Sequence, residues 1–273
     1  MATQAEKAKL FLELHDRDLP LLLPNPWDAG SARLFASLGF EALATTSSGS
    51  AATLGKLDGS LTREQALGSA SEIVEATGLP VSADLENCFA DDPDGVADTI
   101  QRAFGAGLAG CSIEDFSGDP ENPIYDLELA KARVAAAVEA AHAGPVRLVL
   151  TARAENYLHG RPDLDDTIAR LIAYQEAGAD VLYAPGLTSS EDIARVVGSV
   201  ERPVNVLARP GAPSVDELAE LGVSRVSVGG AFAFVALGAV VQAARELREQ
   251  GTYGFAEGAS VGLRAAREAF KQT

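Results

Sequence analysis

Short apolar runs that alternate with helical stretches place the strongest restriction on how this chain can fold. Each run is rich in valine, leucine, isoleucine or alanine, and a turn and an amphipathic stretch follow it. There are eight such runs, at residues 21–24, 42–46, 80–84, 109–114, 146–153, 180–184, 204–208 and 225–228. Strands that alternate with helices pair in parallel, because each crossover helix returns the chain to the same end of the sheet. Eight repeats predict an α/β fold, a (β/α)8 TIM-type barrel.

The length of 273 residues suits one such barrel, so residues 1–273 are expected to form a single domain. Residues 231–273 follow the eighth run as a helical extension. Residues 231–250 have the pattern of one long helix, glycines at 251 and 254 break it, and a terminal helix is expected over 259–270. Because the extension has no core of its own, we expect it to pack on a neighbouring subunit of a homodimer or homotetramer.

The chain is strongly acidic, with a formal net charge of −17 and a pI near 4.5. Nucleic acids and anionic membranes bind clustered lysine and arginine, so neither is expected as a partner. No run approaches the length of a membrane span, and residues 1–10 lack the apolar stretch of a secretory signal. Cys88 and Cys111 fall in or beside predicted strand ends, which argues against a disulfide framework. These features predict a cytoplasmic protein.

Acidic side chains follow two neighbouring runs. Asp84 ends the third run, Glu86 lies two residues beyond it, and Glu114 ends the fourth run. Asp84 and Glu86 are two residues apart, so both are expected to point toward the barrel mouth, where all strand ends meet. The alternative is that these acids only begin helices, where the helix dipole favours them. Unpaired acids at buried strand ends need a counter-ion, and oxygen ligands without nearby histidine favour Mg²⁺ or Mn²⁺ over zinc.

Other residues indicate a site for a small anion. Arg153 ends the fifth run, where a buried guanidinium needs a carboxylate, either that of Glu155 or that of a substrate. The segment Ser47-Ser48-Gly49 follows the second run as a tight loop whose hydroxyl and N–H groups can hold a carboxylate. Asp58, taken alone, is an ordinary turn residue. No lysine falls on a predicted strand, which argues against a Schiff-base mechanism.

In their order and spacing, Asp58 and the segments 82–86, 112–115 and 151–155 resemble the isocitrate lyase/phosphoenolpyruvate mutase superfamily. The likeness extends over nearly the whole chain, from Pro24 to the terminal helix. The resemblance implies a (β/α)8 barrel whose eighth helix is exchanged between the subunits of a dimer, often within a tetramer.

The resemblance also implies a site. Mg²⁺ would be held directly by Asp84 and mainly through waters by three further acids, Asp58, Glu86 and Glu114. The substrate would be a small anionic 2-oxo acid that chelates the metal, while Arg153 and the Ser47-Ser48-Gly49 segment hold its carboxylate. Superfamily chemistry makes or breaks a C–C or P–C bond next to a pyruvate enolate, which the metal and Arg153 are expected to stabilise.

The segment 116–125 departs from the lyases of the superfamily. Isocitrate and methylisocitrate lyases carry a Lys-Lys/Arg-Cys-Gly-His motif there, whereas this segment contains no lysine, cysteine or histidine. Asn122 matches an asparagine of the phosphonate-processing members, but Pro120 stands in place of their lysine. Glycine and proline permit a hinged lid, from which Asn122 or Tyr125 would contact the distal part of the substrate.

Three functions are consistent with these residues, in order of preference. The first is a Mg²⁺-dependent lyase that cleaves a C–C bond next to a 2-oxo or 2-hydroxy carboxylate, like an oxaloacetate decarboxylase or a methylisocitrate lyase. Decarboxylation fits because carbon dioxide leaves without a cysteine acid. The second is P–C bond chemistry of the phosphoenolpyruvate mutase, carboxyphosphonoenolpyruvate mutase or phosphonopyruvate hydrolase type. The third is a barrel that binds 2-oxo acids without catalysis.

Overall fold

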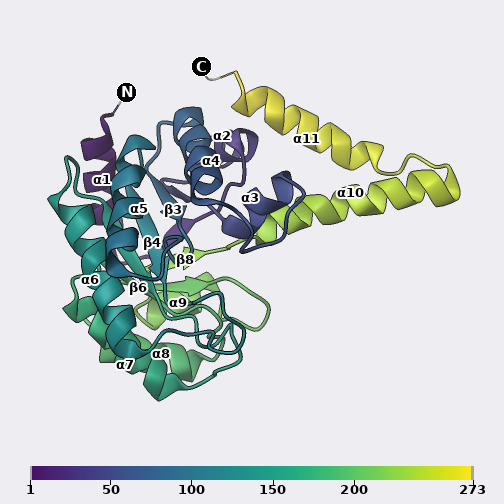
Figure 1. Cartoon of the computed structure of the whole chain (residues 1–273). Coiled ribbons are helices and arrows are strands. Elements are labelled where there is room, and N and C mark those ends of the chain that lie inside the picture. Colours follow the sequence, from purple (N-terminus) through teal and green to yellow (C-terminus); the bar gives the residue numbers. More distant parts are fainter. Residues whose placement is uncertain (1, 272–273) are drawn as a thin grey trace.

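The computed structural model describes residues 2–271 and contains one sheet of eight parallel strands (Figure 1). The strands are β1 Leu21–Leu23, β2 Leu43–Ala44, β3 Val81–Asp84, β4 Gly110–Glu114, β5 Val149–Arg153, β6 Val181–Tyr183, β7 Val204–Leu207 and β8 Arg225–Ser227. Their order is β1-β8-β7-β6-β5-β4-β3-β2. A backbone hydrogen bond from Ala44 N to Pro24 O (3.1 Å) joins the two remaining edges, so the barrel is nearly closed. The predicted (β/α)8 TIM-type barrel is confirmed.

Helices alternate with the strands and surround the barrel (Figure 1). They are α1 Gln4–Glu13, α2 Ala29–Ser37, α3 Ser47–Thr53, α4 Arg63–Ala76, α5 Pro93–Gly105, α6 Leu127–Ala143, α7 Leu164–Glu176, α8 Ser190–Ser199 and α9 Val215–Glu220. The expectation of a loop at Ser47-Ser48-Gly49 is wrong, because these residues begin α3. The Thr46 side chain accepts a hydrogen bond from the Gly49 N–H (3.4 Å) and so caps this helix.

Helix α1 closes the amino-terminal end of the barrel. Its Phe11 is fully buried in an apolar cluster with Leu21, Val149 and Val181. Gly110 makes room for the Phe11 ring, since a Cβ at Gly110 would lie 2.6 Å from Val149 O and 3.0 Å from the ring. The barrel interior is therefore packed at this end.

Replacing Phe11 with alanine should destabilise the protein. The change removes a fully buried ring and leaves a cavity, so we expect the free energy of unfolding to fall by about 3–5 kcal/mol. Urea unfolding measures this. The matched control is Leu10→Ala on the same helix, where the side chain is 43% exposed and the effect should be small. Equal losses in both variants would contradict the role given to Phe11.

Helices α10 Ala231–Gln250 and α11 Ala256–Ala269 project from the barrel as an arm, and α11 returns to pack on α2 (Figure 1). The range predicted for the long helix is confirmed. Helix α11 begins three residues earlier than expected, because the turn before it is short: Gly251 adopts a left-handed φ of 65°, and Glu246 accepts hydrogen bonds from Thr252 (2.7 Å) and Phe255 (3.2 Å). Exchange of the arm between subunits stays a prediction.

Among the described residues, 2–271, no helix combines the length and the apolar character needed to cross a bilayer.

Candidate active site

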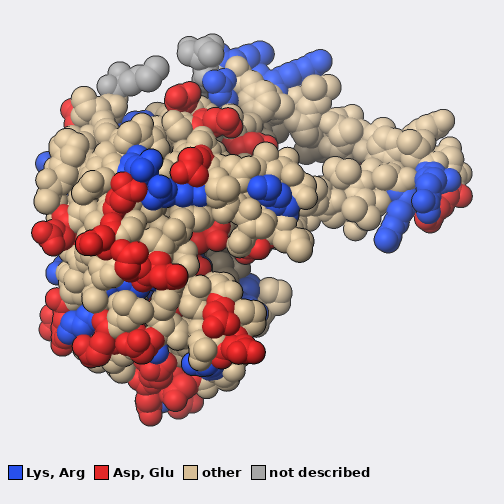
Figure 2. Space-filling model, viewed as in Figure 1, with Lys and Arg blue, Asp and Glu red and all other residues tan. Residues whose placement is uncertain are grey.

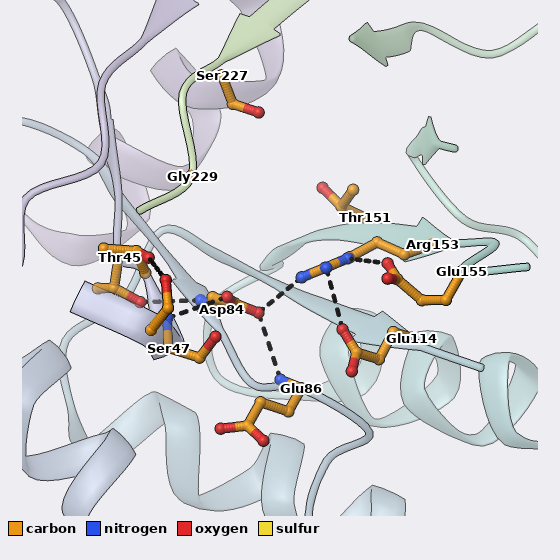
Figure 3. Close-up of polar contacts among 12 residues, drawn as sticks. Thr45, Ser47, Asp84, Glu86, Glu114, Thr151, Arg153, Glu155, Ser227 and Gly229 are labelled. Atoms are coloured by element: carbon orange, nitrogen blue, oxygen red, sulfur yellow. Dashed lines mark hydrogen bonds and ion pairs between the residues drawn. The ribbon is translucent and has the colours of Figure 1, made fainter. Parts of the chain in front are cut away.

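Strands β3, β4 and β5 bring three charged side chains together at the mouth of the barrel (Figure 3). Asp84, Glu114 and Arg153 are the last residues of these strands. Glu114 and Arg153 are register partners, and Asp84 pairs with Ser112, two residues before Glu114. Because register partners and residues two apart share a face of a sheet, all three side chains point into the barrel.

Arg153 contacts a different carboxylate with each of its three nitrogen atoms. Nη1 donates to Asp84 Oδ1 (2.8 Å), Nε donates to Glu155 Oε1 (2.8 Å), and Nη2 lies 3.1 Å from Glu114 Oε2 (Figure 3). The pair with Glu155, one of the two alternatives open from the sequence, is formed. Burial opposes the charge of Arg153, but these carboxylates outweigh it and raise the pKa of the guanidinium well above its usual value. Three acids therefore share one cation.

Glu86 is the acid that lacks a partner. Its Oε1 is buried, and no hydrogen-bond donor in the described part of the chain reaches it. Burial, followed by the charges of Asp84 and Asp58, raises the pKa of Glu86 to about 7 against the opposing effect of Arg153. The Glu86 backbone has a φ of 49°, which is costly for a residue other than glycine. A strained residue that presents an unpaired buried carboxylate indicates a site that needs a positive partner.

We expect Glu86→Gln to change the pH dependence of stability in metal-free buffer. The folded chain keeps a proton on Glu86 up to about pH 7, whereas the unfolded chain releases it near the ordinary value of 4.5. The folded state thus binds more protons in this window, and its stability falls as the pH rises through it. Glutamine cannot ionise. Between pH 5 and pH 8 the free energy of unfolding should therefore fall by about 1–2 kcal/mol less in the variant than in the wild type.

Urea unfolding at the two pH values checks this expectation. Exposed Glu121→Gln is the control and should follow the wild type. The assignment fails if the Glu86 variant has the same pH profile as this control.

The donor set fits a hydrated hard cation. Within residues 2–271, no three Asp, Glu, His or Cys side chains lie close enough together to ligate one ion directly. A zinc site needs three or four direct protein ligands, whereas Mg²⁺ keeps several waters and takes one or two carboxylates. Asp84 and the unpaired Glu86 can supply these, and water-mediated contacts from Asp58 and Glu114 remain a prediction.

A cavity of about 220 Å³ opens at this end of the barrel. Five predicted site residues line it, namely Ser47, Ser48, Asp58, Asp84 and Arg153. The Ser47 N–H donates to Asp84 Oδ2 (3.1 Å), which fastens the start of α3 to the end of β3. Glu86 and Glu114 do not line the cavity but lie beside Asp84 and Arg153.

Gly49 also lies away from the cavity wall. It is buried, and a Cβ at this position would lie 2.6 Å from Thr46 Cγ2 and 3.0 Å from Trp27 Cβ. Glycine therefore lets α3 approach the barrel closely, and in this structure only Ser47 and Ser48 of the segment face the cavity.

The segment 116–125 does not bring Asn122 or Tyr125 to the cavity. Asn122 is exposed, and the Tyr125 hydroxyl donates to Asp91 Oδ1 (2.5 Å) while its ring lies 4.0 Å from the guanidinium carbon of Arg133. Burial and the hydrogen bond to Asp91 raise the pKa of Tyr125 to about 12. Both residues would need movement of the segment to meet a substrate, so their predicted contacts stay predictions.

A family model described as phosphoenolpyruvate phosphomutase matches residues 11–248. The chain belongs to the PEP mutase/isocitrate lyase superfamily. Superfamily members are lyases and mutases, so the protein is an enzyme of this group.

Solved structures of the superfamily match most of the chain. A putative lyase/mutase from Burkholderia cenocepacia J2315 is 55% identical with a TM-score of 0.91, and the match covers 93% of this chain and 92% of that protein. A 2,3-dimethylmalate lyase is 28% identical with a TM-score of 0.82, covering 93% and 90%. Oxaloacetate acetylhydrolase in complex with its product oxalate is 25% identical with a TM-score of 0.85, covering 97% and 94%.

The inner wall of the cavity in this superfamily member includes polar residues that sequence analysis missed. They are Tyr183, Asn205, Arg225 and Ser227, which lie on β6 to β8, and they adjoin Thr151 of the predicted segment 151–155 on β5. The sequence does contain a signal for these residues, namely single polar residues inside otherwise apolar strands. Asn205 interrupts β7, and Arg225 begins β8. A buried polar residue in such a strand needs a partner. Arg225 donates to Asn205 and Thr151, and Asn205 donates to Ser227.

Proposed function

We propose that this protein is a Mg²⁺-dependent lyase that cleaves a C–C bond next to a 2-oxo or 2-hydroxy carboxylate. One observation carries the proposal: three acids share Arg153, and a fourth acid beside Asp84, Glu86, has a buried oxygen without a partner among the described residues. The missing positive charge is what a cation would supply. Two similar proteins, 2,3-dimethylmalate lyase and oxaloacetate acetylhydrolase, are named for small dicarboxylates, which support this substrate class.

The residues of the chain have separable roles in this reaction. Asp84 and Glu86 would hold the cation, which when bound polarises the oxygens of the substrate. Asp84 accepts a hydrogen bond from Nη1 of Arg153 in the structure. When Asp84 holds the cation instead, this N–H becomes free to bind a substrate carboxylate. Ser47 and Ser48 line the same cavity, and their hydroxyls can orient that carboxylate.

Decarboxylation of an oxaloacetate-type substrate suits these groups. The bond from C3 to the departing carboxylate breaks, its electron pair forms the pyruvate enolate, carbon dioxide leaves, and water returns a proton to C3. Arg153 stabilises the negative charge that develops, without reorganising at that moment. No acid from the segment 116–125 is needed, in agreement with its lack of lysine, cysteine and histidine.

P–C bond chemistry is the second candidate, because the matching family model is that of phosphoenolpyruvate phosphomutase. Proton and phosphorus NMR on oxaloacetate, methylisocitrate, phosphonopyruvate and phosphoenolpyruvate, with and without Mg²⁺, separates the two. We expect Mg²⁺-dependent loss of oxaloacetate. Turnover of a phosphonate with no reaction of oxaloacetate would favour the second candidate, and tight binding of oxalate without any turnover would favour a binding protein.

We also propose that the arm of α10 and α11 packs on a second copy of the chain. Residues 231–271 carry five Lys or Arg against four Asp or Glu, although the whole chain has a net charge of −17. Figure 2 shows basic side chains beside a few acidic ones at the tip of the arm, and many acidic side chains over the barrel. Large apolar side chains are exposed on the arm, including Val235 (69%), Val240 (64%) and Leu263 (54%). Such a patch indicates a protein interface.

An assembly of this kind should depend on the apolar face of α10. We expect light scattering to give the mass of a dimer or tetramer for the wild type and of a smaller species for the double variant Val235→Asp/Val240→Asp, because buried charge is costly. Arg245→Asp/Arg248→Asp on the same helix tests the basic tip separately. A monomeric wild type at micromolar concentration would contradict this part of the proposal.

Both cysteines, Cys88 and Cys111, are buried and unpaired. Free thiols are typical of reducing compartments, and this supports a proposed cytoplasmic location.

A further inference from the structure

Arg225 places a second guanidinium inside the barrel, on the side opposite the acidic cluster. It begins β8 and is the register partner of Asn205, which pairs with Tyr183, which in turn pairs with Arg153. Register partners share a face of the sheet, so Arg225 points inward like Arg153. It is 4% exposed and lines the same cavity.

The hydrogen-bond partners of Arg225 are all neutral. Nε donates to Asn205 Oδ1 (2.9 Å), Nη2 donates to Thr151 Oγ1 (3.2 Å), and Nη1 lies 3.3 Å from His15 Nε2. His15 is uncharged, because burial lowers its pKa to about 3 and the charge of Arg225 acts in the same direction. Nδ1 of His15 faces the Phe11 carbonyl (2.8 Å) and must carry the proton, which leaves Nε2 to accept from Arg225.

The charge of Arg225 is therefore uncompensated within the described residues. No acid of residues 2–271 lies within ion-pair distance of it, and burial lowers its pKa only to about 10, so the guanidinium is charged at neutral pH. A guanidinium has five N–H donors, and the three contacts account for three of them. A buried cation with free donors on a cavity wall is costly unless an anion accepts hydrogen bonds from these donors and compensates the charge.

Arg153 differs in this respect, because three carboxylates already neutralise it. Asn205 is also held in place for Arg225, since its Nδ2 donates to Ser227 Oγ (2.9 Å) and directs its oxygen at the guanidinium. The cavity is thus acidic on the β3 and β4 side and basic on the β8 side.

We propose that Arg225, with Asn205 and Thr151, forms a second anion subsite that binds the distal carboxylate of a dicarboxylic substrate. This inference rests on the proposed function for the other end of the substrate, whose 2-oxo or 2-hydroxy carboxylate lies at Arg153 and the acidic cluster. Arg225 then selects dicarboxylates over monocarboxylates by binding the distal carboxylate in the ground state, and in an oxaloacetate-type substrate this carboxylate is the group that leaves as carbon dioxide.

A pair of 2-hydroxy acids that differ in the distal carboxylate tests this subsite. Calorimetry with Mg²⁺ present should show that malate binds the wild type at least about 10-fold more tightly than lactate, as expected for a charge-assisted contact. Arg225→Met should weaken malate binding by about 10- to 100-fold and leave lactate within twofold. Arg225→Lys keeps the charge and should recover part of the preference for malate.

The control is Arg147→Met, which removes an arginine that pairs with Asp180 outside the cavity and should leave both affinities unchanged. Equal losses for malate and lactate in Arg225→Met would show a structural role only, and unchanged malate binding would exclude the subsite. If Arg225→Met does not fold, an unaltered malate-to-lactate ratio in Arg225→Lys overturns the proposal. The ratio of the malate and lactate affinities is measured without turnover. The proposed subsite and the proposed lyase activity can therefore be refuted independently of each other.

Discussion

Asp84→Asn should lower kcat/KM for the 2-oxo acid substrate by about 1,000-fold and abolish its dependence on Mg²⁺. Asp84 is the acid that both lines the cavity and contacts Arg153, and asparagine preserves its shape without its charge. The Ser47 N–H to Asp84 Oδ2 contact can survive with an amide oxygen, so the fold should be retained. Steady-state kinetics across a Mg²⁺ titration, with calorimetry of Mg²⁺ binding, measure both effects.

The matched control for this variant is Asp94→Asn, an exposed aspartate in the first turn of α5. It removes the same charge outside the site and should keep full activity. Mg²⁺-dependent turnover at the wild-type rate in Asp84→Asn would contradict the assignment of the metal to this acid.

Arg153→Met should abolish activity and also destabilise the fold. Removing the guanidinium leaves Asp84, Glu114 and Glu155 without their shared counter-ion, and breaking a buried ion pair on one side costs about 3–5 kcal/mol. Burial already raises the pKa of Glu155 to about 7 even though Arg153 opposes this. Without Arg153 these acids should take up protons, so the loss of stability should be largest at pH 8 and smaller at pH 5.

Urea unfolding at both pH values measures this loss. Arg153→Lys retains a charge but cannot contact three carboxylates at once. Its free energy of unfolding should therefore lie between those of the wild type and the methionine variant. Exposed Arg102→Met, which breaks only the surface pair with Asp98, is the control and should change stability by less than about 1 kcal/mol. Stability of Arg153→Met that equals the wild type at pH 8 would show that the acidic cluster does not depend on this arginine.

The sequence alone predicted the alternation of strands and helices and the strand ends that carry the site. Strand periodicity is local, so the positions of Asp84, Glu114 and Arg153 at the carboxyl ends of β3, β4 and β5 could be predicted without contacts. Segments without periodicity were predicted less well. The residues around Ser47 form a helix rather than a loop.

The barrel and the kinds of side chain at its mouth could be predicted from the residues alone, because both follow from spacing along one strand or helix. Contacts in the folded chain were needed to show that three carboxylates share Arg153, and that Glu86 Oε1 and the charge of Arg225 have no partner of opposite kind within residues 2–271. These facts depend on the register between strands far apart in the chain and on distances of a few ångströms, neither of which any local pattern encodes.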